Sequence, residues 1–328
     1  YADHRDLHLF PYTTLFRSRE MAFLDIQDDY SDNTVDLIDH LIDRDNELYV
    51  LIMSYIQGPD FEEYYNTLLT EGNPEPNIYY FLVKFVFIPL AEFLSYCHHH
   101  GVLHRDLSAG NILISTQQGK IIPVLIDWGA ALNYDPAKIY QTPALLKDCK
   151  PSEEMQIYTS SYNPPEINEC IGLLPQSDIY SFGSIMYYAF TKGTYRERAT
   201  NPEDYVASPK KINKQCPSML DKMVRKCTQY EPRDRYISFD ELKDDLNRYL
   251  KRSIKVTKKR REAKRKAQRL RKLKMLEKSK KKTHRKPLTK KTQKKTVGKK
   301  TPKKTVGKKT PKKTVGKKTP KKTVGKKT

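Results

Sequence analysis

The sequence predicts an α+β protein that ends in a disordered, basic tail. Three observations support this prediction. Short apolar runs at residues 34–38 and 48–56, separated by polar residues, predict β-strands. A long apolar run over residues 78–97 predicts a buried helix. From residue 251 onward the apolar pattern fades, and lysine and arginine dominate.

Charge divides the 328-residue chain into two parts. Residues 1–250 carry 23 Lys and Arg against 37 Asp and Glu, a net charge of −14, whereas residues 251–328 carry 38 against 2, a net charge of +36. The overall charge of +22 therefore comes from the tail, and the body is acidic. One folded domain followed by a tail fits this division better than two folded domains.

The first eighteen residues are set apart from the fold. Residues 11–18 read PYTTLFRS, which resembles the in-frame translation of a common sequencing-adapter oligonucleotide rather than a protein motif. On this interpretation residues 1–18 are an assembly artefact, and the natural sequence resumes near Arg19 without its true upstream part. An ordinary flexible N-terminus is the alternative.

The apolar run over residues 78–97 has the length needed to cross a membrane. It contains Lys84, Pro89 and Glu92, however, and a charge near the middle of an isolated span costs about 3 kcal/mol. A buried helix of a soluble domain is therefore the preferred interpretation, and we expect no membrane partner.

The five cysteines are scattered, with no C-x-x-C pair and no histidine at metal spacing. They predict a reduced, intracellular protein, cytoplasmic or nuclear, without structural zinc. The triplet His98, His99 and His100 resembles a metal-binding tract. Three adjacent residues at a helix end cannot all face one ion, however, so we expect no metal there.

The strongest chemical signal is HRDLSAGN at residues 104–111, followed by an apolar strand. Sixteen residues after Asn111, a second apolar strand ends in Asp127-Trp128-Gly129. These segments resemble the protein kinase catalytic loop H-R-D-L-x-x-x-N and the metal-binding D-F-G, with Trp in place of Phe. The resemblance implies that Asp106 and Asp127 converge from two neighbouring loops on one transferring phosphoryl group.

Three further segments follow in the order of the same family. Residues 158–166 (YTSSYNPPE) resemble the segment that ends in A-P-E, and residues 178–183 (DIYSFG) resemble D-x-x-S-x-G. Residues 231–235 (EPRDR) resemble D-P-x-x-R, whose arginine pairs with the glutamate of the first segment. The resemblance therefore implies that Arg235 meets Glu166.

The implied fold is a two-lobed protein kinase fold of the eukaryotic type. Residues 19–58 would form an incomplete, β-rich N-lobe with the hinge, residues 59–250 a mainly α C-lobe, and residues 251–328 the basic tail. In the catalytic loop, Asp106 would accept or orient the proton of the substrate hydroxyl. The implied Mg²⁺ ligands are Asn111 and Asp127.

Arg105 belongs to the same catalytic set, because it could pair with a phosphorylated residue of the activation segment and order that segment. The candidate phosphorylation sites are Thr142, Ser152, Tyr158, Ser160 and Ser161. For each of them, an ordinary loop hydroxyl is the alternative.

Residues 48–58 resemble the strand that enters the kinase hinge. Met53 would then be the gatekeeper, and Asp60 falls where the family often has a carboxylate near the ribose. The backbone groups that would hydrogen-bond adenine belong to Ser54, Tyr55 and Ile56. An ordinary half-buried strand and turn is the alternative for this stretch alone.

Two elements of the family pattern are not found, namely the Gly-rich loop over the phosphates and the strand lysine that pairs with them. There is no Gly before Gly58, and truncation explains this more simply than a natural pseudokinase. Glu20 is the candidate for the helix glutamate that pairs with the lysine, and a solvated helix residue is the alternative. We therefore expect this chain to bind ATP poorly.

The catalytic loop itself departs from the family at two positions. Ser108 stands where Ser/Thr kinases have a phosphate-contacting Lys, and Gly110 stands where Tyr kinases have an Arg. Less positive charge would then stabilise the transferring phosphoryl group. Thr159 resembles a threonine that Ser/Thr kinases place before the substrate site, which favours Ser/Thr specificity.

The composition of the tail, residues 251–328, predicts electrostatic binding to an anionic partner. Residues 261–278 consist of good helix formers with leucines three residues apart, which predicts a basic amphipathic helix on contact with an anionic partner. Residues 294–328 repeat KKTVGKKTP, in which Gly, Pro and charge density predict disorder. Attachment to nucleic acid or another polyanion is the expected role, and a solubilising tail without a partner is the alternative. The repeat threonines are candidate substrates.

The sequence thus predicts a protein kinase that uses ATP and Mg²⁺ to phosphorylate Ser or Thr hydroxyls of protein substrates. Two alternatives stay open at this point. One is a catalytically weak or silent pseudokinase scaffold, and the other is a nucleic-acid- or polyanion-binding protein that acts through residues 251–328. The sequence does not predict the substrate or the oligomeric state.

Overall fold

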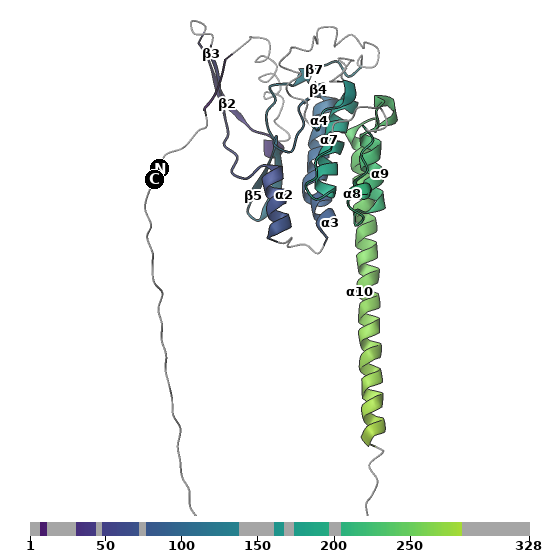
Figure 1. Ribbon diagram of the computed structural model, residues 1–328. Coiled ribbons are helices and arrows are strands. Elements are labelled where there is room, and N and C mark those ends of the chain that lie inside the picture. Colours follow the sequence, from purple (N-terminus) through teal and green to yellow (C-terminus); the bar gives the residue numbers. More distant parts are fainter. Residues whose placement is uncertain are drawn as a thin grey trace, which may run out of the picture. The chain divides into compact units, whose positions relative to one another are not determined.

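The structure is a computed structural model (Figure 1). By its internal contacts the chain divides into two units, residues 1–266 and residues 267–328. The residues that the structure describes are 7–11, 31–43, 48–71, 77–137, 161–166, 174–196 and 205–283.

The N-terminal part of the first unit contains a three-stranded antiparallel sheet. Its strands are β1 (Leu7–Pro11), β2 (Leu37–Asp43) and β3 (Leu48–Met53), in the order β1-β3-β2. Strand β1 comes from the first eighteen residues, which the sequence analysis set apart from the fold. It pairs with β3 from Leu7↔Ile52 to Pro11↔Leu48. This pairing places residues 7–11 in the sheet and does not bear on the origin of residues 1–18.

The predicted long helix is formed by three consecutive pieces, α3 (Ile78–Leu82), the π-helical turn η2 (Val83–Phe87) and α4 (Ile88–His99). Pro89 has no N–H to donate to the preceding turn, and a π turn just before it accommodates that loss. Within the described residues this is the one helix long and apolar enough to cross a membrane. Most of its apolar side chains are buried in the core of the first unit or pack against it.

Short strands position the loops of the candidate site. The pair β5 (Ile112–Gln117) and β6 (Lys120–Leu125) forms a hairpin whose turn residues Gln118 and Gly119 both have positive φ, which suits the twist of a two-residue hairpin. A second small pair is formed by β4 (Val102–Leu103) and β7 (Leu132–Asn133).

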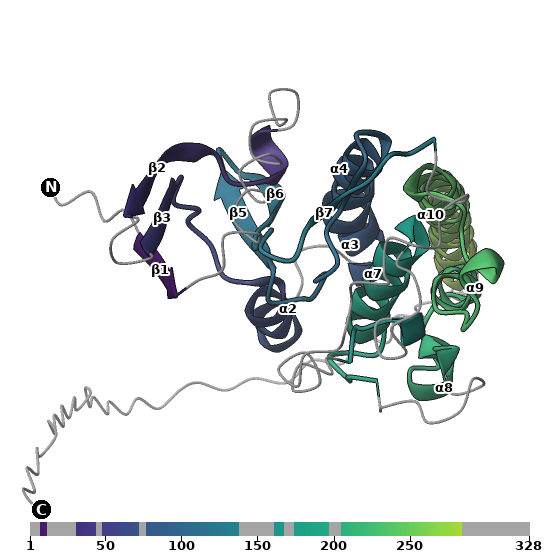
Figure 2. The same ribbon diagram turned by 90° about the horizontal axis from the view of Figure 1, so that it is seen from above.

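The rest of the first unit is helical. The remaining elements are η1 (Ser31–Asn33), α2 (Phe61–Thr70), α7 (Pro175–Phe190), α8 (Pro209–Ile212), α9 (Ser218–Cys227), η5 (Pro232–Asp234) and α10 (Phe239–Thr283). Helix α7 is buried along its whole length and lies between α4 and α9 (Figure 2). Gly183 allows this close packing, because a Cβ atom there would lie 2.4 Å from Cβ of Cys227.

Helix α10 continues past residue 250, where the sequence places the end of the domain. Its first turns bury Phe239, Leu242 and Leu246, whereas the side chains from residue 254 to 278 are exposed. Strong helix formers without Gly or Pro explain why the helix continues to Thr283. The predicted helix over residues 261–278 is therefore part of α10. The repeats lie outside the described residues.

Candidate active site

The β5–β6 hairpin brings the two predicted loops together. Its register pairs Ile112 with Leu125, and the N–H of Ile126 donates to the carbonyl of Asn111 at 2.9 Å. Asn111 ends the HRDLSAGN loop, and Asp127 directly follows Ile126. The two loops are therefore neighbours, as the resemblance implies.

Asp106 is half-buried and is held by Asn111. The amide Nδ2 of Asn111 donates to Oδ2 of Asp106 at 3.2 Å and to its backbone carbonyl at 2.8 Å. Burial raises the pKa of the Asp106 carboxyl. The neighbouring His104 lowers this pKa, the charge of Asp127 raises it, and the Asn111 hydrogen bond lowers it. The net pKa is raised. Because the charge of Asp127 acts on Asp106, the two carboxylates share one electrostatic environment.

Asp127 has a left-handed backbone conformation, with φ of 62°. Its side chain is exposed, and Oδ1 accepts the N–H of Gly129 at 3.3 Å. The amide nitrogen of Asn111 is used by Asp106, which leaves its oxygen as a possible ligand. A carboxylate and an amide oxygen on neighbouring loops are the hard donors that Mg²⁺ prefers, so these residues fit that ion.

His104 ties the two loops to each other. Its Nδ1 accepts the N–H of Asp106 at 3.3 Å, which assigns the proton to Nε2, and Nε2 donates to the carbonyl of Ile126 at 3.2 Å. Burial lowers the pKa of His104, although the charges of Asp178, Asp106 and Asp127 act in the opposite direction. The imidazole is therefore neutral and bridges the loops through two hydrogen bonds.

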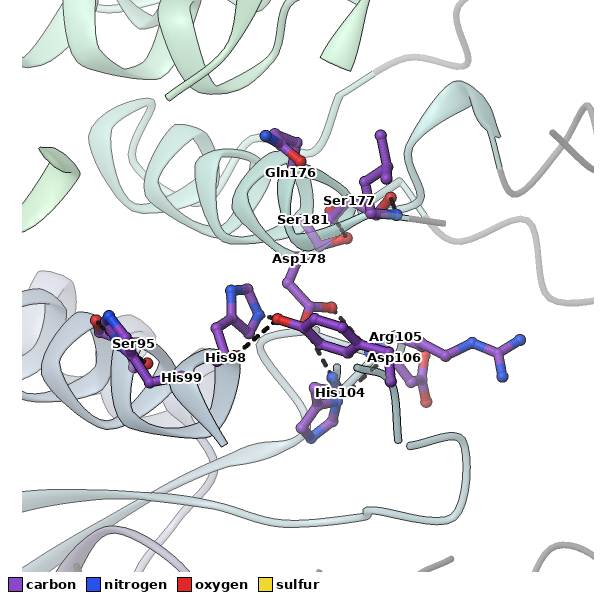
Figure 3. Close-up of polar contacts among 12 residues, drawn as sticks. Ser95, His98, His99, His104, Arg105, Asp106, Gln176, Ser177, Asp178 and Ser181 are labelled. Carbon is purple, nitrogen blue, oxygen red and sulfur yellow. Dashed lines mark hydrogen bonds and ion pairs between the residues drawn. The ribbon is translucent and has the colours of Figure 1, made fainter. Parts of the chain in front are cut away.

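Asp178 anchors the catalytic loop from helix α7 (Figure 3). Its carboxylate accepts the backbone N–H groups of His104 and Arg105, each at 2.8 Å, and Nε2 of His98 at 2.9 Å. Arg105 has φ of 73°, a conformation that is rare for arginine, and the bond to Asp178 holds it there. Asp178 is the first residue of the predicted D-x-x-S-x-G segment, and the sequence pattern does not predict this anchoring role.

The predicted contact between the P-P-E segment and EPRDR is present. Arg235 Nη1 lies 2.6 Å from Oε1 of Glu166, and both side chains are buried. This pair confirms the contact between Arg235 and Glu166 that the resemblance implies.

A sequence comparison points to the same family as the motif resemblance. The family described as "Protein kinase domain" matches residues 17–247. The chain belongs to the protein kinase family. Among the curated relatives of this kinase, one from Clostridium acetobutylicum named "Probable serine/threonine-protein kinase" is 26% identical over 223 residues, covering 66% of this chain and 30% of that protein.

Two further relatives are each named "Serine/threonine-protein kinase PknD". The protein from Chlamydia felis is 28% identical over 185 residues, covering 52% of this chain and 19% of the relative. The protein from Protochlamydia amoebophila is 28% identical over 231 residues, covering 63% of this chain and 23% of the relative. This kinase chain thus spans less than a third of the length of these relatives.

The hinge residues of this kinase are only partly free for a ligand. Asp36 binds the N–H and the hydroxyl of Ser54, because the Asp36 carbonyl accepts the Ser54 N–H at 2.9 Å and the Asp36 N–H donates to the Ser54 hydroxyl at 2.9 Å. The Ser54 N–H is therefore not available for adenine. Met53 is half-buried and Tyr55 is exposed. Adenine binding by the Ser54 carbonyl and by Tyr55 and Ile56 stays a prediction.

Asp60 has a structural role that the sequence analysis did not include. Its carboxylate accepts the N–H of Glu63 at 2.8 Å and caps the N-terminus of α2. One oxygen of this carboxylate is thereby occupied. The predicted place near a ribose stays a prediction.

Ser108 and Gly110, the two unusual positions of the kinase catalytic loop, both lie in the part of the chain that the structure describes. The Ser108 hydroxyl accepts the N–H of Asn111 at 3.3 Å, so it stabilises the loop turn. Gly110 is exposed. The residues predicted from the family that lie outside the described part of the chain are Glu20, Thr142, Ser152, Tyr158, Thr159 and Ser160.

The three consecutive histidines turn to different partners. His98 contacts Asp178, whereas Nδ1 of His99 and Nδ1 of His100 lie 2.7 Å and 2.9 Å from the carbonyls of Ser95 and Tyr96. Within the described ranges no group of three or more His, Cys, Asp or Glu side chains could hold a metal ion. Asn111 and Asp127 stay the predicted cation ligands.

Proposed function

We propose that this chain is the catalytic part of a serine/threonine-protein kinase, which transfers the γ-phosphoryl group of ATP to Ser or Thr hydroxyls of a protein substrate. The observation that carries the proposal is the β5–β6 pairing, together with the hydrogen bond from the Ile126 N–H to the Asn111 carbonyl, which makes the loops of Asp106 and Asp127 neighbours. The relatives named as serine/threonine-protein kinases support the choice of serine and threonine.

In the proposed reaction, Asp106 accepts or orients the proton of the substrate hydroxyl. Its raised pKa makes it a stronger base than an ordinary aspartate, and the Asn111 amide keeps one oxygen in a fixed position. The backbone of the loop is fixed by Asp178, so the base does not need to be reoriented during the reaction.

Asn111 and Asp127 would hold Mg²⁺, which supplies positive charge to the phosphate oxygens when it is bound. With Ser108 and Gly110 in the loop, neither family position for a phosphate-contacting cation carries one. The expected rate is therefore lower than that of a kinase with such a cation.

The direct test is phosphoryl transfer from γ-labelled ATP to a mixture of basic and acidic proteins. Asp106→Asn removes the base and is expected to lower the rate by a factor of about 10²–10⁴. The matched control is Asp244→Asn, which changes an exposed aspartate on α10 and should keep the wild-type rate. Equal rates for the wild type and Asp106→Asn would contradict the proposal. Because this chain is expected to bind ATP poorly, only a wild type that is folded and still inactive at saturating ATP would favour the scaffold alternative.

The exposed part of α10 supports a second candidate function, binding of nucleic acid or another polyanion. Residues 251–278 carry 15 Lys and Arg against 2 Glu, and all of these side chains except Ser253 are exposed. Such a density of positive charge on a helix favours binding by counterion release.

A salt titration tests this second candidate. The full chain should bind a short double-stranded DNA with an affinity that falls at least about 10²-fold between 50 and 200 mM salt. The triple change of Arg261, Arg265 and Arg269 to Gln should weaken binding and reduce the salt slope, whereas Asp106→Asn should change neither. Salt-independent binding, or no binding at low salt, would contradict this role.

A further inference from the structure

Trp128 is the single tryptophan of the chain and stands where the D-F-G segment has phenylalanine. Its side chain is buried, and its ring lies 5.9 Å from that of Phe93 and 4.4 Å from that of His104, measured between centroids. A phenyl ring could make contacts of this kind. The indole also provides a donor that a phenyl ring lacks, the N–H of Nε1.

This N–H donates a hydrogen bond to the hydroxyl of Thr34 at 3.2 Å. Thr34 is only 1% exposed, so water is not available to replace either partner. Turning the Trp128 ring away would leave the buried hydroxyl without this donor and would expose a large apolar surface. The bond therefore favours the inward position of the ring.

Thr34 is itself fixed to the strand that leads into Asp127. It forms a parallel bridge with Leu125, the last residue of β6, and the adjacent Asn33 donates from Nδ2 to the carbonyl of Pro123 at 2.9 Å. Thr34 therefore contacts the chain on both sides of Asp127. It is bridged to Leu125, two residues before Asp127, and hydrogen-bonded to Trp128, one residue after it. A change in the left-handed φ of Asp127 would strain one of these ties.

We propose that the hydrogen bond between Trp128 and Thr34 is a latch that holds Asp127 in the orientation in which it serves, with Asn111, as a cation ligand. Trp128 and Thr34 are positioning residues, because both act through the backbone of Asp127. The consequence for catalysis rests on the proposed kinase function, whereas the latch is a property of the folded chain.

Three variants of the full chain separate the latch from general packing. Thr34→Val nearly keeps the side-chain shape and removes the acceptor, and Thr34→Ser keeps the acceptor. Thr228→Val is the matched control, because Thr228 is also fully buried and its hydroxyl accepts the N–H of Ala207 at 2.9 Å. It removes an equivalent hydroxyl that has no contact with Trp128 in the described structure.

The single tryptophan makes the latch measurable without any activity assay. We expect Thr34→Val to increase quenching of Trp128 fluorescence by acrylamide and to speed hydrogen exchange of the amides at residues 126–129 about five-fold, the factor that corresponds to one neutral hydrogen bond. In a transfer assay it should raise the Mg²⁺ concentration for half-maximal activity, with an unchanged KM for the protein substrate. Thr34→Ser and Thr228→Val should behave like the wild type in all of these measurements.

Unchanged quenching and exchange in Thr34→Val would overturn the latch. The same conclusion follows if Thr34→Ser behaves like Thr34→Val, since the hydrogen bond would then not be the cause, or if Thr228→Val gives the same change. If the wild-type chain transfers no phosphoryl group, the proposed function fails. The quenching and exchange comparison still decides the latch in that case.

Discussion

Arg235 and Glu166 form a buried, two-point ion pair across 69 residues of chain. Nη1 lies 2.6 Å from Oε1, and Nη2 lies 2.9 Å from Oε2. The other guanidinium N–H groups donate to the carbonyls of Gln176, Gln229 and Tyr230. The charge is thus compensated and all its donors are used, which ties the P-P-E segment to the region between α9 and α10.

Glu166→Gln is expected to lower the free energy of unfolding by about 3–5 kcal/mol, because it leaves the Arg235 charge buried without a counter-charge. Urea unfolding monitored by circular dichroism measures this. The control Glu231→Gln changes an exposed glutamate near Arg235 and should stay within about 0.5 kcal/mol of the wild type. A loss below about 1 kcal/mol for Glu166→Gln would mean that the pair contributes little.

Asp178→Asn is expected to lower kcat about 10²-fold with little change in KM, because an amide cannot accept all three N–H groups that hold the catalytic loop. Steady-state kinetics measures the split between kcat and KM. Asp221→Asn is the control, since this buried carboxylate accepts Ser208 Oγ and the Lys210 N–H away from the loop. A similar fall of kcat in both variants would reduce the role of Asp178 to general stability.

The lowered pKa of the buried Asp178 carboxylate makes the stability of the fold sensitive to acid. Burial alone would raise the pKa of Asp178, but hydrogen bonds from His98 and from the Arg105 backbone and the proximity of His104 lower this pKa overall. A lowered folded-state pKa contributes stability above the ordinary value of about 3.9, and this contribution is lost as the pH falls below it. The stability difference between wild type and Asp178→Asn should therefore shrink between pH 6 and pH 3.5 in urea unfolding.

The raised pKa of Asp106 predicts where activity declines in acid. The base must be ionised, so kcat/KM should begin to fall at a pH above the ordinary aspartate pKa of about 3.9. Carbon NMR of labelled aspartate gives the same pKa directly. In Asp127→Asn the NMR pKa of Asp106 should decrease, because the neighbouring negative charge is gone. An unchanged value would show that the two carboxylates are not coupled.

Gly110→Arg is expected to increase the rate of phosphoryl transfer by up to about tenfold, because it adds a cation to a loop that lacks one at both family positions. The site has room, since a Cβ atom there would meet only the Ser108 hydroxyl, at 3.9 Å. Gly110→Glu is the matched control of opposite charge and should lower the rate. Equal effects of both changes would indicate a steric rather than an electrostatic cause.

Motif order predicted the Arg235–Glu166 pair, which the structure contains, and the roles of Asp106, Asn111 and Asp127, which stay predictions. Each of these belongs to a short segment in which residue type and spacing follow from the chemistry, so the local sequence carries the signal. The anchoring role of Asp178 and the bond from Trp128 to Thr34 were not predicted. Their partners lie 73–94 residues apart, and nothing in the local pattern of Thr34 marks it as an acceptor.

The sequence alone determined the local order of the molecule, namely the apolar strands, the long buried helix, the catalytic loop and the helix-forming composition of α10. These depend on side-chain period and on residue type, which are properties of neighbouring residues. Only the tertiary structure decided which buried polar groups meet. That choice depends on how α7 and residues 31–35 pack against the β5–β6 hairpin, because a buried donor is stabilised only by the acceptor that packing brings to it.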